Sequence, residues 1–315
     1  MAICKKTTPL FITPPNTKRE PMTDILQGKQ WNIINADCIE HMASLEPNQF
    51  DFSVFSPPFP SLYAYTNEAG DVGNSEGIQR EGKLHLSFFY QQLARVVKPG
   101  RAICVHVMQI PRLKRSGEVG LHDFRGLNIR IGERAGLVYE YDWAIRKNPQ
   151  AQAIRTRSRE LQFNGLEADR AKQRGTLLDY VIKFRVPGDN QHPINTPGEV
   201  TRNQWIDWAE GCWGDIKETD TLNTREAKAE DDTKHICPLQ LGLINRVVRL
   251  FSDPNEIVFS PFTGIGSEGY ESVKLGRRFY GTELKGEYFE VAKKNLRKAV
   301  DASHESMSLF PELLK

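Results

Sequence analysis

Two adjacent prolines, Pro57 and Pro58, restrict how the chain can fold after an early apolar run. That run, residues 50–55, predicts a short buried strand. Proline fixes φ, lacks a backbone N–H and drives the residue before it into an extended conformation, so the strand must end at Ser56. The Ser56 hydroxyl and nearby carbonyls are then held in a stiff loop, with the ring of Phe59 beside them. A proline-rich surface turn is the alternative interpretation.

A glycine turn near the other end of the chain follows a second predicted strand, residues 256–260. Three glycines in it have the spacing of a nucleotide-binding turn: Gly264, Gly266 and Gly269. A predicted helix over 267–275 and a strand over 279–282 come next, and Glu283 then stands where such folds place an acid on ribose hydroxyls. Together the strand, turn, helix and acid indicate a site for a nucleotide.

The two stretches together resemble the S-adenosylmethionine-dependent DNA amino-methyltransferases, in the permuted subgroup whose catalytic loop precedes the cofactor loop. Ser56-Pro57-Pro58-Phe59 matches the catalytic tetrapeptide of that family, and residues 260–267 match its methionine-binding loop. Further matches lie at residues 35–37 and 235–240, so the resemblance covers most of the chain except its middle. One departure is Ser260, which stands where the family usually has Asp.

The resemblance implies S-adenosylmethionine as cofactor and assigns these residues to its site: Asp37, Pro238, Ser260, Phe262, Gly264, Gly266, Ser267 and Glu283. In this assignment Asp37 accepts a hydrogen bond from the adenine amine of the cofactor. Asp is also a favoured helix N-cap, and one side chain can serve both roles.

The catalytic residues that the resemblance implies are Ser56, Pro57, Pro58 and Phe59. The exocyclic amine of a base is a poor nucleophile because its lone pair is delocalised into the ring. Hydrogen bonds from the amine to the Ser56 hydroxyl and to a carbonyl of the Pro57-Pro58 region favour a more tetrahedral nitrogen and aim its lone pair at the methyl group. Neither a metal nor a covalent intermediate is required. Within the family Ser at the first position is typical of cytosine-N4 enzymes and Asp or Asn of adenine-N6 enzymes, and both bases remain open.

Basic residues gather between positions 146 and 174, where they outnumber the acids: Arg146, Lys147, Arg155, Arg157, Arg159, Arg170, Lys172 and Arg174. Such an excess suits a surface that follows DNA phosphates, although solvated helix faces carry similar runs. The loop over 61–83 is long and polar and holds Tyr63 and Tyr65. We interpret this loop as a flap that closes over an extruded base, with the two tyrosines available to stack on it. A disordered surface excursion is the alternative interpretation.

Composition limits the alternatives. The net charge is +2, so affinity for double-stranded DNA has to come from local clusters of Lys and Arg. The five cysteines are scattered without C-x-x-C spacing, which argues against disulfides or a zinc site and for a reducing cytoplasm. No apolar run approaches the roughly twenty residues of a membrane span, and the start lacks an apolar signal core, so we expect a soluble protein.

The expected fold is a doubly wound α/β sheet, a circularly permuted Rossmann-like methyltransferase fold with an inserted target-recognition region. We expect an arm over 1–29, a catalytic half over 30–145, a target-recognition and DNA-binding region over 146–233, and a cofactor-binding half over 234–315. Strands 257–260, 279–282, 31–35 and 52–55 would be the first to fourth of the unpermuted sheet, with their ligand-facing loops at one edge. The acidic residues late in the third region are expected to face solvent or a second subunit.

Further helices are predicted over 86–97, 125–135, 235–251 and 288–300, and strands over 101–107, 137–145 and 180–185. His106 falls within an apolar strand, which favours a core residue. The rival functions are a non-catalytic DNA-binding regulator on the same fold, which Ser260 suggests, and a nicotinamide-dependent oxidoreductase, for which the Ser-Pro-Pro-Phe loop has no use. A homodimer is implied by the family resemblance alone.

Overall fold

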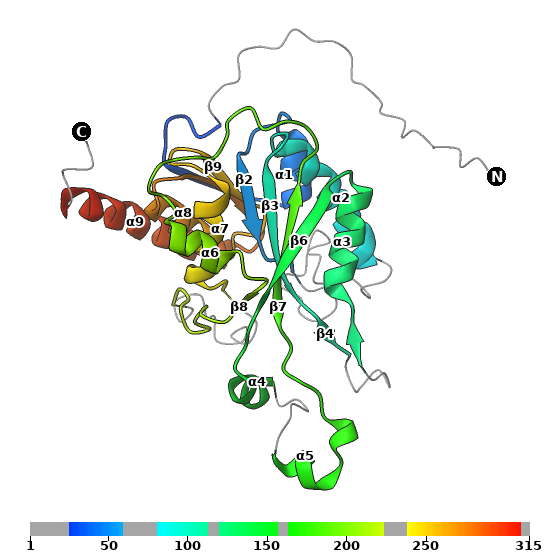
Figure 1. Cartoon of the computed structure of the whole chain (residues 1–315). Helices are drawn as coiled ribbons and strands as arrows, with labels where there is room; N and C mark the ends of the chain where they lie inside the picture. Colours follow the sequence, from blue (N-terminus) through cyan, green and yellow to red (C-terminus); the bar gives the residue numbers. More distant parts are fainter. Residues whose placement is uncertain (1–24, 59–80, 113–119, 157–162, 224–237, 310–315) are drawn as a thin grey trace, which may run out of the picture.

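A single eight-stranded sheet organises the residues that the structure describes, which are 25–58, 81–112, 120–156, 163–223 and 238–309. The computed structural model places its strands in the order β1-β10-β9-β2-β3-β7-β6-β8 (Figure 1). Their bounds are β1 Trp31–Asn35, β2 Phe52–Phe55, β3 Ala102–Met108, β6 Val138–Ile145, β7 Asp179–Arg185, β8 Cys212–Trp213, β9 Ile257–Ser260 and β10 Arg278–Glu283. A small separate ribbon pairs β4, Ile110–Pro111, with β5, Leu121–His122.

Helices cover both faces of the sheet. Their bounds are α1 Cys38–Ser44, α2 Glu81–Val96, α3 Phe124–Arg134, α4 Pro149–Thr156, α5 Phe163–Ala168, α6 Arg202–Trp208, α7 Leu241–Phe251, α8 Ser267–Lys274 and α9 Gly286–Leu309. One apolar cluster packs α1, α2 and α3 against one face, and a second packs α7, α8 and α9 against the other. Strand β3 shows the alternation that this requires, since Ile103 and Val105 belong to the first cluster and Cys104 to the second.

The strand order confirms the permutation predicted from the sequence. The strand predicted as first is β9, the second is β10, the third is β1 and the fourth is β2. In the sheet they lie side by side in the order β1-β10-β9-β2, as the permutation requires. All four run parallel, as does β3 beside β2. Parallel strands end at the same edge, so the loops that follow β2, β9 and β10 are brought together although they lie far apart in the sequence.

The strand at Asp179–Arg185, β7, is antiparallel to both of its neighbours, β3 and β6. Strand β6 therefore runs in the same direction as β3, and the segment between β6 and β7 leaves the sheet at the edge where β2 and β3 end. Figure 1 shows α4 and α5 of this segment beyond that end of the sheet. Helix α4, to which Arg155 belongs, is thus carried on the same side as Ser56.

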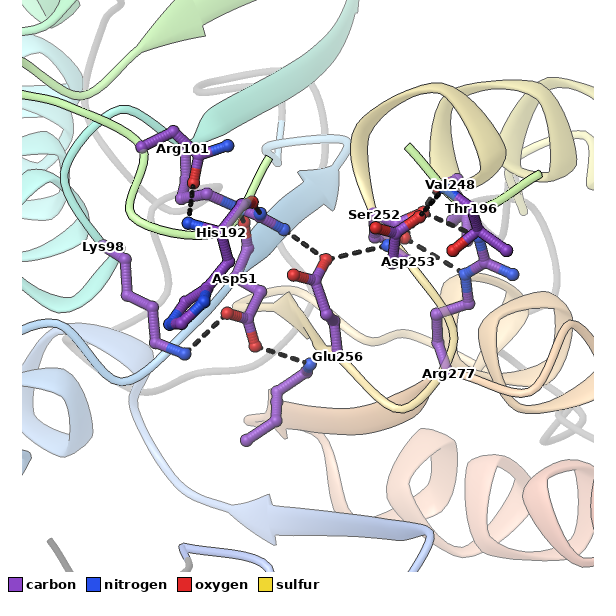
Figure 2. Close-up of polar contacts among 12 residues, drawn as sticks. Asp51, Lys98, Arg101, His192, Thr196, Val248, Ser252, Asp253, Glu256 and Arg277 are labelled. Carbon is purple, nitrogen blue, oxygen red and sulfur yellow. Dashed lines mark hydrogen bonds and ion pairs between the residues drawn. The ribbon is translucent and has the colours of Figure 1, made fainter. Parts of the chain in front are cut away.

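A network of charged and polar residues closes the opposite edge (Figure 2). Asp51, just before β2, accepts a hydrogen bond from the amide of Ile257 at 2.9 Å and pairs with Lys98 at 2.5 Å. The buried guanidinium of Arg101 donates to the carbonyl oxygen of Asp51 at 2.6 Å and pairs with Glu256. These contacts join the start of β2 to the start of β9, and so join the two halves of the permuted fold.

Residues 192–199, which follow β7, lie at this same edge of the sheet, opposite Ser56. Arg101 donates to the carbonyl oxygen of His192 at 3.1 Å, the amide of Thr196 donates to Asp253 at 3.2 Å, and Glu199 pairs with Arg277 at 2.9 Å. The interval expected to recognise DNA, 146–233, is therefore divided by the structure. Its part before β7 lies at the edge of Ser56, and residues 192–199 lie at the other edge.

Some element bounds differ from those predicted. Helix α2 begins at Glu81 and takes up the end of the expected flap, and α9 continues to Leu309. Helix α7 begins at Leu241 and not at residue 235, because Asp220 binds the first amides of the helix. The amide of Leu241 donates to the Asp220 carbonyl oxygen at 2.8 Å, and the amide of Gly242 donates to the Asp220 carboxylate at 3.1 Å. Leu26, placed in the expected arm, is buried in the core.

Of the acidic residues expected to face solvent or a second subunit, Asp215 and Asp220 are exposed and Glu218 is half-buried, and all three also bond within the chain. Asp215 pairs with Arg246 of α7 at 2.5 Å, and Glu218 accepts a hydrogen bond from the amide of Asn148 at 2.7 Å. These acids hold α7 and the end of β6 in place. None of the described helices is long and apolar enough to cross a membrane.

Candidate active site

Ser56 lies at the carboxyl end of β2, where the two prolines end the strand as predicted. Its position is set by the pairing of Phe55 with Val105 of β3. The half-buried Ser56 hydroxyl donates a hydrogen bond to the carbonyl oxygen of His106 at 3.1 Å. Pro57 is buried, so the loop is anchored to the body of the protein.

The glycine turn begins at the end of β9, the strand beside β2. Ser53 of β2 is opposite Phe259 of β9 in the parallel register. The ring centroid of Phe262, within the turn, lies 5.8 Å from the ring centroid of Phe55 and 5.0 Å from that of Phe89. Aromatic packing therefore couples the proline loop to the glycine turn.

Within the turn, Gly264 and Gly266 adopt positive φ angles of 54° and 91°, a region that favours glycine. Beside Gly264 no described atom lies within 4 Å of where a Cβ would stand, so a ligand can approach the backbone there. At Gly269 a Cβ would come within 2.6 Å of Phe279 and Leu296, so this glycine allows α8 to pack closely. These are the uses that nucleotide-binding folds make of such glycines.

Glu283 ends β10 and holds the turn from the side. Its carboxylate accepts hydrogen bonds from the amide of Gly264 at 2.7 Å and from that of Lys285 at 2.9 Å. The acid predicted from its spacing thus lies directly against the glycine turn.

Asp37 follows β1 and is the N-cap of α1, as its alternative role predicted. One carboxylate oxygen, Oδ1, accepts hydrogen bonds from the amides of Ile39 at 2.8 Å and Glu40 at 3.0 Å. Among the described residues nothing donates to Oδ2, which leaves it able to accept a bond from an amine. Both roles proposed for Asp37 are therefore compatible.

Orphaned polar atoms mark the methionine end of the predicted cofactor site. Among the described residues, four buried side-chain atoms lack a hydrogen-bond partner: Gln240 Oε1, Arg246 Nε, Ser260 Oγ and Ser267 Oγ. Ser260 ends β9, Ser267 is the first residue of α8, and Gln240 is the N-cap of α7. Gln240 stands two residues after the half-buried Pro238. Buried polar groups are normally paired, so this arrangement fits a polar ligand that supplies the missing partners.

The site also contains a carboxylate that the sequence pattern did not reveal. Glu268, in the first turn of α8, is buried, and burial together with the charge of Glu283 raises its pKa to about 8. His106, expected as a core residue, is largely buried in β3, and both of its ring nitrogens have a neighbour: Nδ1 lies 3.4 Å from Ser56 Oγ and Nε2 lies 3.0 Å from Asp179. The sequence did not indicate that this core histidine lies against Ser56.

The sequence pattern of a family described as DNA methylase, N6_N4_Mtase, matches residues 50–294. The chain belongs to this DNA methylase family. The match spans both the proline loop and the glycine turn, and S-adenosylmethionine is the cofactor that accompanies the family and its fold.

Curated relatives of this methylase match it over short segments. The type II methyltransferase M.BglII of Bacillus subtilis is 38% identical over 63 residues, 20% of this chain and 18% of its own length. M1.MboII of Moraxella bovis is 40% identical over 58 residues, 18% of this chain and 22% of its own. The DNA adenine methyltransferase YhdJ of Escherichia coli K12 is 38% identical over 74 residues, 24% of each chain. The aligned segments thus span only about a fifth of these relatives.

Solved methylase structures share the fold over most of the chain. TTHA0409 of Thermus thermophilus, in complex with S-adenosyl-L-methionine, has a TM-score of 0.62 at 19% identity and covers 85% of this chain and 95% of its own. The cytosine-N4-specific PvuII DNA methyltransferase has a TM-score of 0.61 at 17% identity, covering 87% and 91%. At these identities the likeness establishes the fold.

The residues that this methylase was expected to place on DNA are only partly described. Phe59 of the tetrapeptide, and Tyr63, Tyr65, Arg157 and Arg159, lie outside the described residues. Arg155 belongs to α4, and Arg146 is exposed at the end of β6. Lys147 is different: it is buried and pairs with Asp179 at 2.6 Å, so its ammonium cannot reach a phosphate. The assignment of Lys147 to DNA is therefore corrected.

Proposed function

We propose that this methylase transfers a methyl group from S-adenosylmethionine to the exocyclic amine of a base flipped out of double-stranded DNA, at specific sites. The observation that carries the proposal is the proximity of two loops. The Ser56 loop and the glycine turn follow neighbouring parallel strands, joined by the bond from Ser53 Oγ to the Phe259 carbonyl at 3.0 Å. An acceptor for a base amine thus lies beside a cofactor site.

When bound, the cofactor supplies a methyl group on a positively charged sulfur. Glu283 would hold its ribose hydroxyls and Asp37 its adenine amine, while Gln240, Ser260 and Ser267 would meet its methionine end. Ser56 accepts a hydrogen bond from the base amine, and with a carbonyl of the Pro57-Pro58 region it orients the nitrogen lone pair toward the methyl group. Phe59 is proposed to stack on the extruded base.

We propose cytosine N4 as the target, because Ser56 occupies the first position of the tetrapeptide, with adenine N6 as the alternative. Among related proteins, PvuII is named for cytosine N4 and YhdJ for adenine. The type II names of other relatives support a place beside a restriction enzyme.

For DNA recognition we propose the part of the chain between β6 and β7, with Arg146, Arg155, Arg157 and Arg159 as phosphate or base contacts and Tyr63 and Tyr65 as stacking residues of the flap. The antiparallel course of β7 supports this, because it makes that part of the chain leave the sheet at the edge of Ser56. The 1–29, 30–145 and 234–315 divisions and the homodimer remain predictions.

The deciding experiment is incubation of the purified protein with varied unmethylated DNA and methyl-labelled S-adenosylmethionine, followed by digestion to nucleosides and mass spectrometry. Labelled N4-methylcytosine is the expected product, and labelled N6-methyladenine would change the base alone. Absence of label in both nucleosides, from a protein that binds the cofactor and DNA, would favour the non-catalytic regulator.

A further inference from the structure

We propose that His106, Asp179 and Lys147 form a proton relay behind Ser56, which removes the proton that the base amine must release when it is methylated. The relay rests on the proposed methyltransferase function and adds positioning residues to it. Nothing in the proline loop itself can take up a proton at neutral pH, since a serine hydroxyl is a very weak base. A basic group behind the hydroxyl can take up that proton.

The three residues come from three neighbouring parts of the sheet. His106 is near the carboxyl end of β3, Asp179 is the first residue of β7, and Lys147 follows β6. The distances run continuously from Ser56 Oγ to His106 Nδ1 at 3.4 Å, from His106 Nε2 to Asp179 Oδ2 at 3.0 Å, and from that oxygen to Lys147 Nζ at 2.6 Å. Hydroxyl, imidazole and carboxylate follow one another in the order found where a histidine base activates a serine hydroxyl and an acid orients the histidine. Here the nucleophile is the base amine, and the Ser56 hydroxyl only passes the proton on.

Asp179 determines which nitrogen of His106 is free to accept. Burial acts to raise the pKa of Asp179, but the charge and hydrogen bond of His106, with those of Lys147, hold it below its usual value. The ionised carboxylate accepts a hydrogen bond from Nε2–H, so in the neutral ring Nδ1 carries no proton. That bare nitrogen faces Ser56.

The Ser56 hydroxyl has two acceptors within reach. It now donates to the His106 carbonyl oxygen at 3.1 Å, and Nδ1 of the same residue lies 3.4 Å away. Rotation about the Cβ–Oγ bond moves the hydroxyl proton from one to the other without displacement of any heavy atom. The hydroxyl oxygen keeps a lone pair for the base amine in either position.

A purely structural role accounts poorly for this group. The side chains of His106, Asp179 and Lys147 are only 12%, 8% and 4% exposed, so their desolvation opposes folding. On the same face of β3, Cys104 and Ala102 are apolar, and an aliphatic residue at 106 would continue the pattern. The buried charges are aligned on the one hydroxyl that the proposed reaction uses.

The amine nitrogen forms a bond to the methyl carbon, and the carbon–sulfur bond breaks with its electron pair left on sulfur. The nitrogen then carries an extra proton, which passes to Ser56 Oγ while the hydroxyl proton passes to His106 Nδ1. Ser56 ends neutral, and His106 ends as an imidazolium between Ser56 and Asp179. After the base has left, His106 returns the proton to water through the 12% of its side chain that stays exposed.

The test is single-turnover methyl transfer by the full chain across pH, for His106→Asn, Asp179→Asn and the wild type. The groups facing His106 are Ser56 after β2, Asp179 on β7 and, through Asp179, Lys147. We expect the wild-type rate to fall at acid pH, because the relay has to accept a proton in each turnover. We expect His106→Asn to lower the rate about 100-fold, to remove that acid dependence, and to leave cofactor affinity unchanged.

The matched control is His41→Asn, because His41 is another half-buried histidine and its Nε2 is bonded at 2.8 Å to Tyr280 of β10, a strand that β9 separates from β2. It should keep the wild-type rate and pH profile. Imidazole in the buffer should partly restore His106→Gly, which a structural role would not explain. A folded His106→Asn protein with the wild-type rate and profile would refute the relay.

If His106→Asn does not fold, Asp179→Asn decides: an unchanged profile overturns the relay, and a lowered rate with a shifted acid limb supports it. Failure of the wild type to label any DNA would instead remove the methyltransferase function, and the relay with it. The two failures are therefore distinguished by the wild-type reaction alone.

Discussion

The hydroxyl of Ser53 donates a hydrogen bond to the carbonyl oxygen of Phe259 at 3.0 Å, across 206 positions of sequence. Both residues are fully buried, and they lie on the neighbouring parallel strands β2 and β9. Strand β2 leads into the loop of Ser56 and β9 into the glycine turn. The bond therefore fixes the relative position of the two loops on which the proposed transfer depends.

Replacement of Ser53 by Ala should destabilise the fold by roughly 1 kcal/mol, because it removes one buried hydrogen bond and leaves the carbonyl with one partner fewer. Chemical denaturation measures this. Ser87→Ala is a suitable control, since the Ser87 hydroxyl bonds only within its own helix, to the Lys83 carbonyl at 2.7 Å. If Ser53→Ala lowers the free energy of unfolding no more than Ser87→Ala does, the hydrogen bond between β2 and β9 contributes little to stability.

Replacement of Ser56 by Ala should cut turnover and leave cofactor binding nearly unchanged, since the hydroxyl meets the base and not the cofactor. Calorimetry with S-adenosylmethionine and the nucleoside assay measure the two quantities separately. Unaltered turnover would remove Ser56 from its role.

Replacement of Gly264 by Val should abolish cofactor binding. The φ of 54° is strained for a β-branched residue, and the new side chain would enter the space beside the turn that is left for a ligand. Gly276→Val is the matched control, because Gly276 has a similar φ of 76° and equally open space but follows α8 at its far end. If both variants bind the cofactor equally well, the glycine turn is not the site.

Glu268 should make stability depend on pH. Its folded pKa is raised to about 8 by burial, from a usual value of 4.5, so between these values the folded protein keeps a proton that the unfolded chain releases. Stability from this group is fully present below about pH 4.5 and is lost as the pH rises to about 8, by roughly 1.4 kcal/mol per unit.

Urea denaturation at pH 5, 6, 7 and 8 tests this against Glu268→Gln, which cannot ionise. The stability of the variant relative to the wild type should increase steadily over this range, by a few kcal/mol at most. A difference that stays constant with pH would show that Glu268 is ionised in the folded protein.

The network in Figure 2 predicts a large loss of stability for Arg101→Met. The substitution leaves Glu256 and the carbonyl oxygens of Asp51 and His192 without their buried partner, at a cost of about 3 kcal/mol or more. In contrast, Arg130→Met breaks an ion pair with Asp123 whose side chains are 56% and 54% exposed, and it should cost less than about 1 kcal/mol. Equal losses in denaturant unfolding would contradict this account of the edge opposite Ser56.

Much of the sheet could be predicted because its signals are local. Two prolines end β2, the glycine turn opens α8, and the spacing of Glu283 places it after β10. The parallel pairing of β1, β10, β9 and β2 then follows from the known behaviour of such folds. Helix ends were less predictable where a distant residue decides them, as Asp220 does at the start of α7.

What the sequence by itself determined is the proline loop of Ser56 and the glycine turn, since each depends on residues that are neighbours in the chain. The order of these two loops along the chain, read with the family resemblance, then gave the permuted order of the fold. Only the tertiary structure decided that His106, Asp179 and Lys147 stand behind Ser56. Their contacts depend on the antiparallel register of β7 between β3 and β6, which puts Asp179 near the end of β3. That register is set by side-chain packing across the whole sheet, and a single histidine in an apolar strand carries no local sign of it.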